Sequence, residues 1–153
     1  MYRVGVKQKM DVGHFLIGDF GEESVPHRHD YEVEWRFDVS DLDSNGFAVD
    51  IAWMRELLEL VAEELRGTML NDHPFFKTRQ TSVENFSRFV MSRLAEIADS
   101  IFEFDEEGPE LVRSDDDPIR RDNPFDSAKC SEIIVWESED AWASFSIRPG
   151  DTN

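Results

Sequence analysis

Alternating polar and apolar residues predict strands near both ends of the chain, because successive side chains of a strand point to opposite faces. The alternating segments are residues 2–9 with a continuation to residue 17, residues 27–39, residues 130–138 and residues 140–148. A turn at residues 18–23, which contains two glycines, makes the first two segments a hairpin-like pair. Ser138 and Glu139 form a tight connection between the last two segments.

Between these strands, apolar residues recur at helical spacing in two segments. The first covers residues 51 to about 65, and Asp50 is placed to cap its N-terminus. The second follows a capping-box sequence, in which the Thr81 hydroxyl accepts from the amide of Glu84, and it extends to about Ile101. Two strands, two helices and two strands in this order favour an α+β fold, with both helices on one face of a four-stranded antiparallel sheet.

Residues 103–129 interrupt this pattern with a run rich in Asp, Glu, Pro and Arg. We interpret them as an acidic surface insertion, with a short strand near residues 110–113, in a single domain that spans residues 1–153. The whole chain carries 16 basic and 34 acidic residues, a formal net charge of −18. Such a charge argues against nucleic acid or an anionic membrane as a partner.

The length of the apolar runs and the number of cysteines bear on whether the protein spans a membrane or is held by disulfides. No apolar run approaches the roughly 20 residues that span a membrane. Cys130 is the one cysteine of the sequence, which excludes an intramolecular disulfide framework and makes a cytoplasmic location the expectation. With 40% hydrophobic residues among 153, the chain is long enough to bury the core of one domain.

Three of the four histidines lie where neighbouring strands can bring them together. His27 and His29, in the sequence HRHDY, project from the same face of one strand, about 7 Å apart, and His14 lies in the other strand of the pair. Three neutral imidazoles with a fourth position open are typical of a catalytic zinc site, although iron, nickel and copper also accept such ligands. An HxH sequence alone is also common on a solvated strand, so the metal site is a hypothesis.

The order of elements and the motifs together resemble the 6-pyruvoyltetrahydropterin synthase / 6-carboxytetrahydropterin synthase family. Its members are zinc enzymes of the tunnelling fold that act on 7,8-dihydroneopterin triphosphate. The family's HGHxY is matched by HRHDY, and its histidine at the end of the first strand is matched by His14. Its PT-x-E-N segment resembles residues 80–85, without the proline, and its V-x-E-T resembles residues 135–138. The resemblance implies that His14, His27 and His29 bind Zn2+.

Further roles follow from the resemblance. It implies that Glu137 holds the amino-pyrimidine edge of the pterin, where a carboxylate accepts two parallel N–H groups, and that Thr81 and Ser82 add hydrogen bonds. From the residues alone, an exposed carboxylate at a strand end is the favoured interpretation of Glu137. Thr81 and Ser82 are equally well interpreted as a simple helix cap. The resemblance also implies that sheets of several subunits join edge to edge into a barrel, as trimers or hexamers, which removes open sheet edges.

Three departures from the family pattern concern the chemistry. Glu23 stands where the family has its catalytic cysteine, four residues before the first histidine of HGH, and is either a substitute base or a solvated turn residue. The family's L-D-H motif aligns by spacing with residues 65–67, which erases its Asp–His dyad, or with Asp72 and His73, which keeps the dyad but shortens the following loop. Arg28 replaces a glycine and could reach toward a triphosphate.

The resemblance therefore predicts a zinc-dependent lyase acting on 7,8-dihydroneopterin triphosphate. Its product would be of the 6-carboxytetrahydropterin type, which feeds queuosine-like deazapurine synthesis, or of the 6-pyruvoyltetrahydropterin type. One alternative is a glutamate-dependent cleavage of the side chain to 6-hydroxymethyl-dihydropterin, for folate synthesis. Another is a homologue that binds zinc and pterin without catalysis. The expected partners are the small pterin substrate and further copies of the chain.

Overall fold

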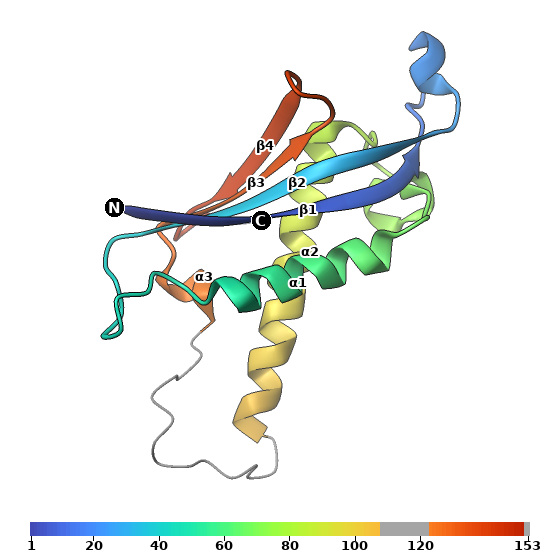
Figure 1. The fold of residues 1–153 in the computed structure, drawn as a ribbon. Coiled ribbons are helices and arrows are strands. Elements are labelled where there is room, and N and C mark those ends of the chain that lie inside the picture. The colour runs from blue at the N-terminus through green and yellow to red at the C-terminus, as the bar shows by residue number, and fades with distance from the viewer. Residues whose placement is uncertain (108–122, 152–153) are drawn as a thin grey trace.

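A four-stranded antiparallel sheet, in the order β1-β2-β3-β4, forms one layer of the fold (Figure 1). Its strands are β1 (Tyr2–His14), β2 (His27–Val39), β3 (Cys130–Trp136) and β4 (Trp142–Ile147). This computed structural model describes residues 1–107 and 123–151. The short strand expected near residues 110–113, and with it much of the acidic insertion, lies outside the described residues.

Two long helices, α1 (Ile51–Leu65) and α2 (Val83–Glu107), cover one face of this sheet (Figure 1). The shorter helical elements include α3 (Pro124–Ser127) and the 3-10 turns η1 (Gly21–Ser24), η2 (Leu70–Asp72) and η3 (Pro74–Phe76). The predicted order of two strands, two helices and two strands is confirmed, and α2 continues past its expected end at Ile101. No helix within residues 1–107 and 123–151 is long and apolar enough to cross a membrane.

Alternation along β2 separates the two faces of the sheet. Every second side chain from Tyr31 to Val39 is buried, and those between them are more exposed. From Tyr31 to Phe37, this buried row packs with apolar side chains of both long helices and of β3 in one core. His27 and His29 continue the same row toward the start of β2, so the strand period places their rings on the helix-covered side of the sheet.

The opposite face of the sheet carries charged side chains in cross-strand pairs. Arg3 Nε lies 2.6 Å from Asp38 Oδ1, and Lys7 Nζ lies 2.6 Å from Glu32 Oε1. The hydrogen bond from Arg3 lowers the pKa of the Asp38 carboxyl. Exposed ion pairs of this kind stabilise a fold little, but they keep the face polar, and none of the described helices lies on it (Figure 1).

The N-terminus of α1 is capped as the sequence predicts. Asp50 Oδ1 accepts hydrogen bonds from the amides of Ala52 at 2.9 Å and Trp53 at 3.2 Å. These two amides belong to the first turn, where a helix has no carbonyl of its own to pair them. The cap therefore fixes where α1 begins.

Replacing Asp50 with alanine is expected to lower the free energy of unfolding by about 1 kcal/mol, since both amides lose their acceptor. Urea denaturation followed by circular dichroism measures the change. Asp41→Ala, which removes a nearby exposed aspartate outside the helix, is the matched control. Equal losses in the two variants would mean that charge, and not the cap, is responsible.

The N-terminus of α2 differs from the predicted capping box, and the expectation for Thr81 is wrong in this respect. The residue that caps α2 is Ser82, whose hydroxyl accepts from the amide of Asn85 at 3.4 Å. The Thr81 hydroxyl instead donates to the carbonyl of Phe15 at 2.9 Å. Thr81 is buried against the end of β1, so a tertiary contact takes the hydroxyl that the local pattern assigned to the helix.

The chain after α1 runs beside the outer edge of β1, next to His14. The amide of Gly67 donates to the carbonyl of Asp11 at 3.0 Å, and the amide of Gly13 donates to the carbonyl of Thr68 at 2.8 Å. Gly67 has a φ of +73°, a conformation that favours glycine and allows the sharp exit from the helix. This pairing anchors the part of β1 that carries His14.

Candidate metal centre

The register of the β1–β2 pair brings three imidazoles together. His14 lies directly opposite His27, and His29 follows two residues later on the same face of β2. One donor atom from each of the three rings and from Glu23 can be chosen so that all four lie within 4.8 Å of one another. We call His14, Glu23, His27 and His29 the four-residue cluster. His14 is buried, whereas His27 and His29 are partly exposed.

Backbone carbonyls fix the orientation of two of these rings. His14 Nδ1 lies 2.8 Å from the Thr81 carbonyl, and His27 Nδ1 lies 2.7 Å from the Val25 carbonyl. Because a carbonyl can only accept, each Nδ1 carries the proton of the neutral ring and each Nε2 keeps its lone pair. Burial lowers the pKa of His14 and outweighs the opposing effect of the Thr81 carbonyl, so the neutral ring is favoured.

The ring nitrogens converge on one region, so the four-residue cluster could hold a metal ion. His27 Nε2 lies 3.0 Å from His29 Nε2, and the centroid of the His14 ring lies 4.5 Å from that of His27. Two nitrogen lone pairs at such a distance repel each other unless a proton or a cation lies between them. Neutral imidazoles held by hydrogen bonds at their second nitrogen are common zinc ligands, so the donor set fits this ion.

Tyr31 extends the site, although the sequence alone assigned it no role. Its ring stacks on His29 with centroids 4.8 Å apart, and its hydroxyl lies 3.5 Å from His14 Nε2. Burial raises the pKa of Tyr31, which keeps the phenol neutral. Its place as the last residue of HRHDY, on the same strand face as both histidines, is the signal that could have identified it.

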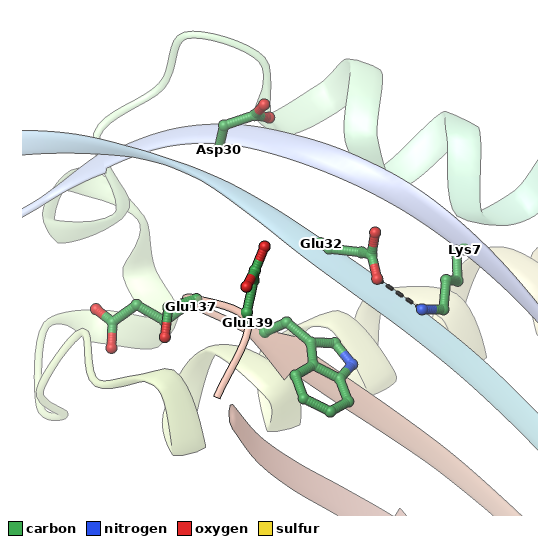
Figure 2. A pocket seen from close by; sticks show the side chains of 7 residues that line it. Lys7, Asp30, Glu32, Glu137 and Glu139 are labelled. Carbon is green, nitrogen blue, oxygen red and sulfur yellow. Dashed lines mark hydrogen bonds and ion pairs between the residues drawn. The ribbon is translucent and has the colours of Figure 1, made fainter. Parts of the chain in front are cut away.

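Glu137 links this cluster to a pocket at the end of β3. Its Oε1 lies 3.5 Å from His29 Nε2. The pocket has a volume of about 400 Å³ and is lined by Lys7, Asp30, Glu32, Trp136, Glu137, Ser138 and Glu139 (Figure 2). Its one lysine is paired with Glu32, so carboxylates dominate and the pocket favours groups that donate hydrogen bonds.

Comparisons with known proteins identify the family of this chain. The family model for 6-pyruvoyl tetrahydropterin synthase matches residues 3–113, which is more than half of the chain. The chain belongs to the 6-pyruvoyl tetrahydropterin synthase family. No curated protein matches the sequence at a significant level.

Solved structures of 6-pyruvoyltetrahydropterin synthases share the fold. A Plasmodium vivax variant, described as a catalytic residue mutant with glutamate changed to alanine, has a TM-score of 0.68 and 14% identity, covering 96% of this chain and 98% of that one. The Plasmodium falciparum protein has a TM-score of 0.66 and 14% identity over the same shares. The Caenorhabditis elegans protein has a TM-score of 0.65 and 17% identity over 94% of each chain. The expected tunnelling fold is confirmed.

The other residues that the family resemblance suggested lie in different surroundings. Thr81 contributes its carbonyl to His14 while its hydroxyl bonds Phe15, and Ser82 caps α2. Thr81 thus contacts a candidate metal ligand directly. A local helix-start pattern in the sequence could not indicate this contact, because it joins residues 67 positions apart.

Asp72 and His73 lie away from the four-residue cluster. His73 Nδ1 accepts from the amide of Phe75 at 3.2 Å, and its ring packs against Phe89 with centroids 4.6 Å apart. Asp72 is exposed. In the described part of the chain, no hydrogen bond or ion pair joins either residue to the cluster. Glu23, by contrast, has Oε2 3.3 Å from His27 Nε2.

Arg28 lies between the two histidines of β2 but points to the opposite face of the strand. Its Nη2 lies 2.7 Å from Asp11 Oδ1, and its Nη1 lies 3.4 Å from the Gly67 carbonyl. Both side chains of the ion pair are about half exposed, at 48% and 49%. Arg28 is therefore accessible to an anion, but only in competition with Asp11.

Proposed function

We propose that this member of the 6-pyruvoyl tetrahydropterin synthase family is a zinc-dependent lyase acting on 7,8-dihydroneopterin triphosphate. The proposed reaction is of the 6-carboxytetrahydropterin synthase type, in the queuosine pathway, or of the 6-pyruvoyltetrahydropterin synthase type. The observation that carries the proposal is the convergence of three imidazoles, two of them oriented by backbone carbonyls, in a chain of this family. We place the protein in the cytoplasm.

In this proposal His14, His27 and His29 hold Zn2+, whose chemistry would be to polarise the oxygen atoms of the substrate side chain. Glu137 accepts the N–H groups of the amino-pyrimidine edge, which suits the carboxylate-rich pocket that it lines. Thr81 keeps the His14 ring in position through its carbonyl. Ser82 adds a hydrogen bond to the pterin at the start of α2.

A second candidate reaction is glutamate-dependent cleavage to 6-hydroxymethyl-dihydropterin. Glu23 occupies the position of the family cysteine and lies 3.3 Å from His27 Nε2. The Plasmodium vivax protein, whose fold this chain shares, has a glutamate described as a catalytic residue. Glu23 would then be the group that takes a proton from the substrate. A homologue that binds zinc and pterin without catalysis is the third candidate.

Asp72 and His73 are proposed as an acid–base pair that acts from a displaced position. For this role the His73 ring would have to leave the amide of Phe75 and its contact with Phe89.

The assembly is proposed to be a homo-oligomer, a trimer or a hexamer. Edge-to-edge joining of sheets would pair β4 with the part of the outer edge of β1 that residues 67–69 do not cover, and would close a barrel.

A product assay by mass spectrometry tests the function. The zinc-loaded protein would be incubated with 7,8-dihydroneopterin triphosphate, with and without a chelator. A new pterin that forms only without the chelator would support a metal-dependent lyase, and its mass would separate the carboxy, pyruvoyl and hydroxymethyl products. Unchanged substrate, with bound zinc and bound pterin both demonstrated, would favour the non-catalytic homologue.

Replacing Arg28 with alanine is expected to raise KM for the triphosphate about two- to fivefold and to leave kcat unchanged. An exposed charge interaction contributes roughly 0.4–1 kcal/mol to binding, and this contribution is equal in the ground and transition states. Steady-state kinetics measure both constants. Arg3→Ala, at the far end of the same sheet face, is the control. An unchanged KM in Arg28→Ala would mean that Arg28 serves only its ion pair with Asp11.

A further inference from the structure

Glu23 is placed where a fourth metal ligand would lie. Its Oε2 is 3.3 Å from His27 Nε2, and its carboxylate belongs to the set of donor atoms that lie within 4.8 Å of one another. In a tetrahedral site with bonds of about 2.0–2.2 Å, neighbouring ligand atoms lie roughly 3.3–3.6 Å apart. The Glu23–His27 distance therefore equals one edge of such a tetrahedron.

The proton positions also favour a cation between these two groups. His27 Nδ1 donates to the Val25 carbonyl, so in the neutral ring His27 Nε2 has a lone pair and no proton. A carboxylate oxygen facing this lone pair is an acceptor opposed to an acceptor. A proton or a metal ion between the two atoms removes this repulsion, and a metal ion can bind both atoms together with the other two rings.

The backbone holds Glu23 in place from the adjoining turn. The amide of Leu16, just beyond β1, donates to the Glu23 carbonyl at 2.7 Å. The Ser24 hydroxyl donates to the Gly18 carbonyl at 2.7 Å and accepts from the amide of Phe20 at 2.9 Å. The turn is thus tied to the end of β1 that carries His14, and the Glu23 side chain approaches the cluster from its solvent side, 50% exposed.

Two other nearby carboxylates, those of Glu22 and Glu137, are not grouped with all three imidazole rings. Glu22 lies in the same turn but outside the four-residue cluster. Glu137 contacts His29 at 3.5 Å but is also outside the cluster. Within residues 1–107 and 123–151, Glu23 is the one carboxylate grouped with all three imidazoles.

We propose that Glu23 is itself a ligand of the bound metal, and that with His14, His27 and His29 it closes a four-coordinate site in the resting protein. This inference rests on the metal site of the proposed function and goes beyond it, because a base held near the ion would leave the fourth position to water. A substrate oxygen would have to replace a carboxylate in order to reach the metal. The displaced carboxylate would then lie beside that oxygen, where it can accept a proton.

Cobalt binding to the metal-free full-length protein tests the inference independently of activity. We would titrate Co2+ into the wild type, Glu23→Ala, Glu23→Gln and the control Glu22→Gln, against a competing chelator. Both Glu23 variants are expected to bind Co2+ at least about ten- to a hundredfold more weakly, because even the loss of a residue that only orients a metal ligand weakens binding by that factor. Glu22→Gln removes the same charge from the same turn and is expected to stay within about twofold of the wild type.

Added azide then reports whether the fourth position is open. The visible spectrum of the cobalt-loaded wild type is expected to resist azide, whereas Glu23→Ala is expected to bind it and change its spectrum. Circular dichroism of the metal-free variants checks that each is folded, and Glu23→Gln keeps the shape of the side chain.

Two results would overturn the inference. The first would leave the proposed function standing, and the second would overturn it as well. Equal cobalt affinity in all four proteins, with an equal azide response in wild type and Glu23→Ala, would show that Glu23 is not a ligand and would leave the three-histidine site intact. A folded wild type that binds no cobalt and no zinc would overturn both the inference and the zinc-dependent function.

Discussion

Replacing His27 with alanine is expected to abolish tight metal binding and to lower kcat/KM for the pterin substrate by about a thousandfold or more. The substitution removes one of the three imidazoles of the cluster, and the one that lies within 3.3 Å of Glu23. A metal acting as Lewis acid contributes several kcal/mol to a reaction of this class. At about 1.4 kcal/mol for each factor of ten, a loss of about 4 kcal/mol corresponds to roughly a thousandfold.

The fourth histidine of the chain supplies the control. His73 lies in an aromatic cluster with Phe75, Phe76 and Phe89 rather than beside the other three. Elemental analysis after dialysis should therefore find one metal ion per chain in His73→Ala and none in His27→Ala. The activity of His73→Ala reports separately on its proposed acid–base role. A His27→Ala protein with the metal content of the wild type would contradict the three-histidine site.

The strand pair that carries the cluster was predictable because its signals are local. Alternation from Tyr31 to Val39, continued back to His27 with the same period of two, fixes which side chains share a face. The glycine-containing turn before this segment makes the first strand its antiparallel partner. From these two features His14, His27 and His29 can be expected on one face. The resemblance to a family of zinc enzymes then turned a common HxH sequence into a specific prediction.

The features that sequence reasoning missed depend on contacts between distant segments. The Thr-x-x-Glu pattern of residues 81–84 fits a capping box, but burial of Thr81 against Phe15 decides which hydroxyl caps α2. The pairing of Gly13 with Met69 along the edge of β1 has no repeating pattern in the sequence. The position of His73 depends on aromatic packing with Phe89, which the ambiguous spacing of its loop could not indicate.

The two faces of the sheet carry different kinds of side chains. On the helix-covered face, the row of β2 passes from the apolar core at Trp35 to the histidines at its start. On the other face, the ion pair of Lys7 and Glu32 lines the carboxylate-rich pocket to which Glu137 also belongs (Figure 2). Strand β2 carries both buried core side chains and two candidate ligands. The position of His27 and His29 therefore depends on how well the core side chains of β2 pack.

Trp35→Ala is therefore the substitution expected to cost the most stability, about 3–5 kcal/mol. The Trp35 side chain is fully buried, and its ring packs against Phe37, Trp53 and Phe125 at centroid distances of 5.0, 6.2 and 5.7 Å. Its Nε1 donates to the Ser131 hydroxyl at 3.0 Å, which joins β2 to β3. Alanine leaves a large cavity in the central strand and removes this donor.

Urea denaturation of the metal-free protein measures this loss, at one protein concentration for all variants. Trp142→Ala is the matched control, because Trp142 lies on the edge strand β4 and is 55% exposed, and its loss is expected to be under about 1 kcal/mol. Equal losses in the two variants would mean that β2 is not the centre of the core. A large loss confined to Trp35→Ala would show that the packing around Trp35 holds the strand on which His27 and His29 lie.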